Sequence, residues 1–172
     1  MRLVRPDMHY ESQILAFRKE MMEAGDSFDG CAGLELTESV SQWLNFEERL
    51  KQLYGDGYVP SDVFLYVDVQ DQLIGIIDYR HPLTPFLLQY GGSIGYSIRP
   101  SCRRQGHAVN MLKQMLEYCK QVKEEKVLLC CDRDNIGSYK TIQACGGRME
   151  NMVQDDVGLS KSGWIRRYWI IL

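Results

Sequence analysis

A strand, a long amphipathic helix and a buried strand follow one another between residues 93 and 131, and this succession constrains the fold most strongly. Residues 93–99 are typical of a strand and stop at Pro100, which cannot continue a ladder. Residues 104–123 repeat apolar side chains at intervals of three and four, and residues 127–131 form a continuous apolar run. Two strands joined by a helix call for a right-handed crossover and a locally parallel pair.

The segments on either side of this unit predict further strands and helices. They are a strand at 2–5, helices around 14–22 and 40–53, a hairpin of strands 62–69 and 73–79, a helix at 136–144, and strands at 148–153 and 164–172. Thr37 or Ser39 would cap the second helix and residues 54–57 would close it, while the glycine-rich, acidic segment 25–36 is expected to be a mobile loop. We therefore expect an α+β, or mixed α/β, single domain over residues 1–172, with a mostly antiparallel central sheet, one parallel strand pair and about four flanking helices.

Composition and charge exclude several classes of protein. With 45% hydrophobic and 25% charged residues, the chain is typical of globular proteins rather than disordered ones. No apolar run reaches the roughly 20 residues that cross a bilayer, and the N-terminus lacks the apolar stretch of a secretory signal, so we expect a cytoplasmic protein with no membrane partner. Six cysteines without a C-x-x-C pair predict reduced, mostly buried thiols and no metal, and a net charge of -3 argues against nucleic acid as a partner.

Residues 99–108 place three arginines and a single glycine just before the long helix. The first amides of a helix lack partners and carry about half a positive charge. Gly106 lets a ligand approach the backbone closely, Ala108 keeps the first turn small, and Arg103 and Arg104 add charged donors. The segment therefore predicts a phosphate site, in particular for a diphosphate. It lacks the Gly-Lys-Ser/Thr ending of a P-loop and the three glycines of a dinucleotide fingerprint.

The same segment carries a family resemblance. The pattern Arg-x-x-Gly-x-Ala over residues 103–108 resembles the Gln/Arg-x-x-Gly-x-Gly/Ala signature that opens the long helix in the GNAT acetyltransferase superfamily. The strand 127–131 then leads to Asn135, small residues, a helix and Gly146-Gly147, which is similar to the superfamily's second signature. A closer similarity, to bacterial predicted acetyltransferases of unassigned substrate, rests on Arg80-His81, residues 91–96 and residues 167–170.

The resemblance implies that acetyl-CoA binds as a co-substrate where the strands 93–99 and 127–131 splay apart. Its pyrophosphate would lie on the backbone of Arg103, Arg104, Gln105, Gly106, His107 and Ala108. Its pantetheine arm would pair with the strand edge near Ile98, Asn135 would bond a pantetheine amide, and Ser138 would face the same arm. The structural alternatives are an exposed basic turn for the arginines, a simple helix cap for Asn135 and a small packing residue for Ser138.

The implied reaction is a direct N-acetyl transfer from acetyl-CoA to a primary amine of a small molecule, peptide or protein. Because amines are largely protonated at neutral pH, a base is expected. Asp78, His81 and Tyr96 are available, and the sequence does not choose among them. Many relatives place a tyrosine seven residues after the asparagine to protonate the leaving thiolate. That position is Ile142 here, so the predicted catalytic acid is Tyr139, three residues earlier on the same helical face.

Other interpretations stay open at this level. A CoA-binding sensor without turnover would explain Ile142 and the missing base, and an anion-binding or nucleic-acid-binding module would explain the arginines. Cys130 and Cys131 lie in an apolar strand and predict inert core thiols rather than an acyl carrier.

The acceptor is expected to be an amine-bearing small molecule or peptide, and a homodimer is left open. The loops 25–36, 54–61 and 81–92 would shape its pocket, and the acidic residues Asp26, Asp29 and Glu35 favour a cationic acceptor. Five aromatic residues belong either to this pocket or to the core: Phe28, Trp43, Tyr54, Tyr58 and Phe86.

Overall fold

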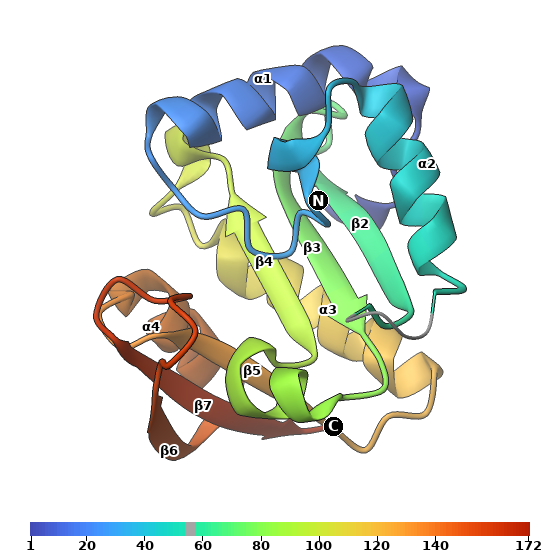
Figure 1. Ribbon diagram of the computed structural model, residues 1–172. Coiled ribbons are helices and arrows are strands. Elements are labelled where there is room, and N and C mark those ends of the chain that lie inside the picture. The colour runs from blue at the N-terminus through green and yellow to red at the C-terminus, as the bar shows by residue number, and fades with distance from the viewer. Residues whose placement is uncertain (54–57) are drawn as a thin grey trace.

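Two antiparallel sheets that meet at one edge form the framework of the molecule, seen in a computed structural model that describes residues 1–53 and 58–172 (Figure 1). The first sheet has the order β1 (Arg2–Val4), β2 (Ser61–Val67), β3 (Leu73–Arg80) and β4 (Ile94–Ile98). The second has the order β5 (Lys126–Asp132), β7 (Trp164–Ile171) and β6 (Arg148–Gln154). The α-helices are α1 (Glu11–Glu23), α2 (Val40–Leu50), α3 (His107–Gln121) and α4 (Ile136–Ala144). The predicted mostly antiparallel architecture with four flanking helices is confirmed.

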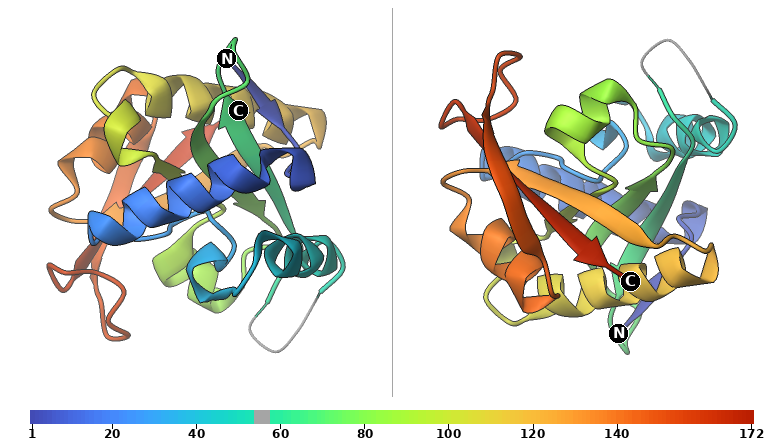
Figure 2. Two further views of the ribbon diagram at one scale, coloured as in Figure 1. Left: turned by 90° about the horizontal axis from the view of Figure 1, so that it is seen from above. Right: turned by 90° about the horizontal axis from the view of Figure 1, so that it is seen from below.

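Helices cover both faces of the four-stranded sheet. Both views of Figure 2 place α3 and α4 on one side of the strands and α2 on the other. The alternation along β2 explains this division, because Leu65 packs with Trp43 of α2 on one face and Tyr66 packs with Met111 of α3 on the other. All four side chains are fully buried, and burial of a large apolar side chain stabilises the fold by about 1.5–3 kcal/mol.

The strands β4 and β5 are the facing edges of the two sheets. β4 pairs with β3, and β5 pairs with β7. Between them the structure has an isolated antiparallel bridge at Gly92 and Leu129, next to which the Ser93 amide donates to the Leu128 carbonyl at 2.7 Å. The strands β4 and β5 therefore separate as expected. They diverge from a single antiparallel bridge, whereas the sequence predicted a parallel pair. Each strand already has a ladder on its other edge, and the twist of the two sheets carries them apart.

The segment between α1 and α2 is more ordered than a mobile loop. Cys31 is fully buried and Leu34 is 1% exposed, and a 3-10 turn spans Leu34–Leu36. The carbonyl of Asp29 accepts a bond of 2.8 Å from the Ser97 hydroxyl on β4. The expectation of a mobile loop over residues 25–36 fails here because apolar side chains within the polar segment anchor it to the core.

Other details refine the sequence predictions. Ser39 caps α2, since its Oγ accepts from the Gln42 amide at 3.1 Å, whereas the Thr37 hydroxyl donates to the Leu34 carbonyl. The predicted closure of that helix by residues 54–57 lies outside the described residues. In the ranges 1–53 and 58–172, no helix has the length and apolar character needed to cross a membrane, and no group of three or more potential metal-ligating side chains occurs.

Candidate cofactor cleft and active site

The N-terminus of α3 presents a run of amides without partners. Among the described residues, the N–H groups of residues 104–109 donate no hydrogen bond, and the first helical bond runs from the Asn110 amide to the Gly106 carbonyl at 3.2 Å. Gly106 is the N-cap, with φ +80°, and a β-carbon there would meet nothing within 4 Å. An open helix start with this many free donors, together with the helix dipole, is suited to binding an anion.

The backbone of β4 offers a second set of groups. The Arg99 amide donates to the Ile74 carbonyl at 2.9 Å, and the Arg80 amide donates to the Ser93 carbonyl at 2.7 Å. Hydrogen-bonded pairs alternate along an antiparallel ladder, so the odd-numbered residues of β4 face β3. The amides and carbonyls of the even-numbered residues between 94 and 98 consequently face the gap toward β5. An extended ligand can pair with this edge.

Arg103 departs from its predicted role. Its Nε donates to the Ile98 carbonyl at 3.0 Å, and one terminal nitrogen lies 2.7 Å from Oδ2 of Asp26. The side chain thus ties the end of β4 to the loop after α1, and only its backbone lies at the open helix start. Arg104, by contrast, is exposed and forms no ion pair within the part of the chain that the structure describes. Of the two predicted phosphate-binding side chains, the geometry favours Arg104 alone.

The other residues of this segment that were predicted to bind the cofactor differ in their burial and contacts. Gln105 is exposed, and Ala108 packs against the core on the α3 side. The ring of His107 lies edge-on to Tyr66, with 6.3 Å between ring centroids. The Nδ1 atom of His107 and the hydroxyl of Tyr66 are buried, and neither has a hydrogen-bond partner among the described residues.

A chain of polar groups runs from α4 to β4 at the splay. Asn135 caps α4, its Oδ1 accepting from the Ser138 amide at 3.0 Å, which confirms the simple capping role that the sequence left open. The Ser138 hydroxyl lies 3.0 Å from the hydroxyl of Tyr96, which also donates to the Ser138 carbonyl at 3.3 Å. The structure therefore brings together two predicted cofactor residues and Tyr96, which the sequence named only as a possible base.

Tyr139 does not join this group. Its ring lies beneath the guanidinium group of Arg166 on β7, 4.7 Å from ring centre to carbon. One residue advances a helix by about 100°, so Tyr139 leaves α4 in a different direction from Ser138. Ile142, at the position where relatives carry a tyrosine, is fully buried in the core. The predicted catalytic acid thus points toward the three-stranded sheet instead of the β4 edge.

The opposite side of β4 carries the loop after α1. The Asp29 carboxylate is exposed, accepts a bond of 2.7 Å from the Ser27 hydroxyl and forms no ion pair in the described ranges. The carbonyl of Asp29 accepts a bond of 2.8 Å from the Ser97 hydroxyl, so the residue lies beside β4. Asp26, in contrast, is paired with Arg103.

Comparison with known proteins identifies the family of this chain. The model of the acetyltransferase (GNAT) domain matches residues 37–148, which is more than half of the chain. The chain belongs to the GNAT acetyltransferase family. The resemblance identified from the two signatures is thereby confirmed. The matched range ends at the first residue of β6 and includes both signatures.

Relatives of this GNAT chain differ in their acceptors. It is 26% identical over 105 residues to YnaD, an uncharacterized N-acetyltransferase of Bacillus subtilis (strain 168), and the match covers 60% of this chain and 59% of YnaD. The fold is similar to RimL, a ribosomal L7/L12 alpha-N-protein acetyltransferase solved with coenzyme A, with a TM-score of 0.73, 15% identity, and 99% and 93% of the two chains covered. It is also similar to the spermidine N-acetyltransferase SpeG from Vibrio cholerae, with a TM-score of 0.70, 15% identity, and 99% and 95% covered.

The two remaining candidates for the general base, His81 and Asp78, contact residues of β2 and β3. His81 lies 3.7 Å from Asp62 and stacks on Tyr79, on the side of the sheet that carries α3. Asp78 is 5% exposed, and both of its carboxylate oxygens accept from Nε of Arg80 at 3.1 Å.

The cysteines and aromatic residues named from the sequence are mostly structural. All six cysteines are free, and burial raises the pKa of Cys130 to about 12 and that of Cys131 to about 11, so both stay protonated and unreactive. Trp43 is fully buried and Phe28 packs against the same cluster. Tyr58 and Phe86 are about half exposed, and Tyr54 lies outside the described residues.

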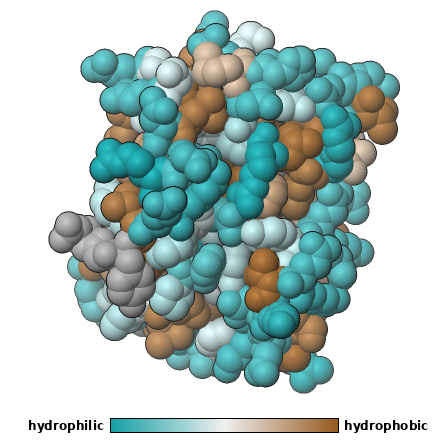
Figure 3. Space-filling model, turned by 90° about the vertical axis from the view of Figure 1, so that its right-hand side faces the viewer, coloured by the Kyte–Doolittle hydropathy of each residue, from teal (hydrophilic) through white to brown (hydrophobic). Residues whose placement is uncertain are grey.

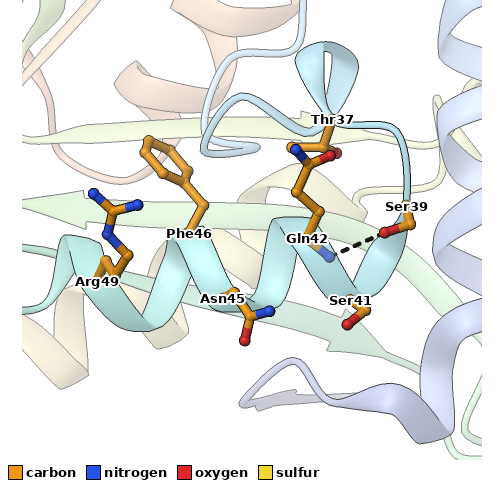
Figure 4. Close-up of a pocket in the computed structure, with 7 residues that line it drawn as sticks. All are labelled: Thr37, Ser39, Ser41, Gln42, Asn45, Phe46 and Arg49. Atoms are coloured by element: carbon orange, nitrogen blue, oxygen red, sulfur yellow. Dashed lines mark hydrogen bonds between the residues drawn. The ribbon is translucent and has the colours of Figure 1, made fainter.

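A surface depression of about 420 Å³ lies along α2, and none of its lining residues belongs to β4 or to the start of α3 (Figure 4). Its lining residues are Thr37, Ser39, Ser41, Gln42, Asn45, Phe46 and Arg49. All of them come from α2 or the residues just before it, and the side of the molecule with α2 is largely hydrophilic, with scattered apolar side chains (Figure 3). A shallow hollow on one helix does not bring together groups from several elements, so the β4 edge and the α3 N-terminus stand as the candidate site.

Proposed function

We propose that this protein is an acetyl-CoA-dependent N-acetyltransferase that transfers acetyl directly to a primary amine of a small molecule, peptide or protein. The observation that carries the proposal is the run of free amides over residues 104–109, located where the open edge of β4 ends. These amides suit the diphosphate of acetyl-CoA, and Arg104 adds a cation beside it. The pantetheine arm would then lie along the even-numbered residues between 94 and 98, with Asn135 beside it.

The acetyl group is proposed to move in one step from sulfur to nitrogen. An acyl-enzyme would need a reactive nucleophile at the gap, but Cys130 and Cys131 are held as buried, protonated thiols. Family membership supports acetyl transfer, and the activities of RimL and SpeG support an amine as the acceptor. The α1–α2 loop with its exposed Asp29 suits an amine that carries a positive charge before reaction.

Calorimetry with acetyl-CoA, followed by an assay of thiol release, tests this function. We expect binding by the wild-type chain, abolished by competing CoA, and release of free thiol with at least one amine from a panel of polyamines, amino acids, aminoglycosides and peptides. Binding without any thiol release across the panel would instead favour a CoA-binding sensor. Absence of heat at millimolar acetyl-CoA would contradict the cofactor assignment altogether. The cytoplasmic location and the homodimer stay predictions.

A further inference from the structure

Acetyl transfer needs a group that stabilises the departing CoA sulfur, and the two obvious positions on α4 do not supply it. Ile142 is apolar and fully buried, and the ring of Tyr139 is covered by Arg166. A thiolate is a fair leaving group, but a positioned proton donor still accelerates such steps by typically 10²–10⁴-fold. A hydroxyl on another element beside the open edge of β4 could take this role.

Tyr96 meets the geometric requirements. It lies at the middle of β4, and its own amide and carbonyl belong to the edge that faces the gap. Its side chain projects to the α4 side, where its hydroxyl lies 3.0 Å from Oγ of Ser138. The residue is partly buried and packs against the core cluster on this side of the sheet. A ligand thiol at this edge would lie beside a phenol that is already held in place.

We propose that Tyr96, positioned by Ser138, is the proton donor to the departing CoA sulfur in this enzyme, in place of a tyrosine on α4. The inference rests on the proposed acetyl transfer and adds the residue that assists departure of the leaving group. Tyr96 would be the catalytic residue, because its hydroxyl touches the sulfur. Ser138 would be a positioning residue, because it acts through Tyr96.

The hydrogen bonds between Tyr96 and Ser138 allow Tyr96 to donate its proton to the CoA sulfur. A phenol has one O–H donor and can accept from a neighbour. In the structure the Tyr96 hydroxyl donates a long bond of 3.3 Å to the Ser138 carbonyl, and the Ser138 hydroxyl is within 3.0 Å to donate to the phenol oxygen. Tyr96 can therefore turn its proton to the sulfur while Ser138 still holds its oxygen. Burial raises the pKa of Tyr96, and the hydrogen bond with Ser138 acts in the opposite direction, which is the direction that a proton donor requires.

The step balances in atoms and charge. The neutral amine nitrogen bonds to the thioester carbon, and the carbon–sulfur bond breaks with its electron pair going to sulfur. Tyr96 gives its proton to the sulfur and forms CoA thiol. Water takes a proton from the new amide nitrogen and returns one to the phenolate. The net change moves one proton from nitrogen to sulfur and requires no oxidant or reductant.

The decisive experiment compares Tyr96→Phe with Tyr139→Phe, which removes a hydroxyl from the neighbouring element. We expect Tyr96→Phe to lower kcat by about 10²-fold, with the Kd of acetyl-CoA within twofold of wild type, since only the transition state loses a bond. Tyr139→Phe should change kcat by less than twofold. Steady-state thiol release and calorimetry supply both readouts.

A donor with a better leaving group separates proton donation from a structural role. In acetyl-CoA with selenium in place of sulfur, the departing selenolate is a much weaker base and needs little protonation. We expect Tyr96→Phe to lose less than tenfold with this donor, compared with about 10²-fold with acetyl-CoA. An equal loss with both donors, or a loss found only in Tyr139→Phe, would overturn the proposal.

Ser138→Ala keeps the inference testable if Tyr96→Phe fails to fold. Loss of the positioning bond should lower kcat by about three- to tenfold, with the same dependence on the donor, and Ser138→Thr should restore most of the rate because it keeps a hydroxyl. Full activity in Ser138→Ala, or a folded and fully active Tyr96→Phe, would refute the assignment while leaving the acetyltransferase function intact. A wild-type chain that releases no thiol with any amine would refute both.

Discussion

A β-carbon on Gly30 would lie 2.2 Å from the carbonyl carbon of Gly95, so the loop after α1 touches the backbone of β4 directly. Gly30 also has φ +76°, a left-handed conformation that costs other residues about 1–2 kcal/mol. The contact, together with the bond from Ser97 to the Asp29 carbonyl, holds the loop beside the proposed reaction centre.

Gly30→Ala should therefore destabilise the protein by about 2–4 kcal/mol, the sum of the φ cost and the clash with β4. It should also raise the KM for the amine, because the loop must lift. Thermal unfolding and thiol release measure the two effects. Gly25→Ala is the matched control, since Gly25 has φ +61° in the same loop but open space around a β-carbon. Equal losses in the two variants would refute the importance of the contact.

Gly106→Leu should weaken acetyl-CoA binding by at least tenfold, because its side chain would enter the open space at the start of α3. Gly146→Leu is the control: Gly146 also has a positive φ and open space around a β-carbon, but it follows α4. Both variants should lose similar stability, about 1–2 kcal/mol for the left-handed residue. Calorimetry distinguishes them, and unchanged affinity in Gly106→Leu would contradict the cleft assignment.

Substitutions of Arg103 and Arg104 should have different effects. The first should lower the stability of the fold, and the second should weaken the binding of CoA. Arg103→Gln removes the bonds to Ile98 and Asp26, and we expect it to lower stability by about 1–2 kcal/mol. Arg104→Gln should leave the melting temperature unchanged and raise the Kd of CoA by about three- to tenfold, most strongly at low salt. The reverse result, with weak CoA binding and full stability in Arg103→Gln, would restore the phosphate role predicted from the sequence.

The carboxylate of Glu20 should make the free energy of unfolding depend on pH in the acid range. Burial alone would raise the pKa of Glu20, but bonds from Ser101 and Arg99 outweigh it and lower the pKa below its ordinary value of 4.5. A lowered pKa means that the carboxylate stabilises the fold above that value and that this stability is lost as the pH falls through the folded-state pKa. Glu20→Gln should cost about 1 kcal/mol at pH 7 after allowance for solvent screening, with the difference shrinking below about pH 4. Urea unfolding across pH tests this, and a difference that is constant with pH would contradict it.

Asp29→Asn should raise the KM for a cationic amine by about three- to tenfold and leave the Kd of acetyl-CoA unchanged, because it removes the exposed negative charge that the proposed function assigns to attraction of the amine. Asp156→Asn in the loop between β6 and β7 removes an equally exposed charge and serves as the control. The expected loss should disappear for an uncharged amine. A uniform loss for charged and uncharged amines would argue against charge recognition by Asp29.

Local sequence patterns were sufficient to predict most helices and strands and the free backbone amides at the start of α3. The three- and four-residue periodicity of residues 104–123 and the apolar run of 127–131 predicted α3 (His107–Gln121) and β5 (Lys126–Asp132), because side-chain alternation follows directly from helix and strand geometry. The free amides before α3 were also predictable, since every helix start leaves donors without partners. Gly106 marked where the ligand could approach.

The directions of individual side chains were not predictable in the same way. Asp26, the partner of Arg103, is 77 positions away in the chain, and Tyr96 meets Ser138 only because α4 packs near β4. The roles assigned to Arg103 and Tyr139 depended on such long-range contacts. The sequence by itself determined the secondary structure, the family signatures and the open helix start, which depend on near neighbours along the chain. Only the tertiary structure decided that Tyr96 lies beside Ser138 and that Arg103 pairs with Asp26, because packing between distant segments selects among the rotamers that local geometry allows.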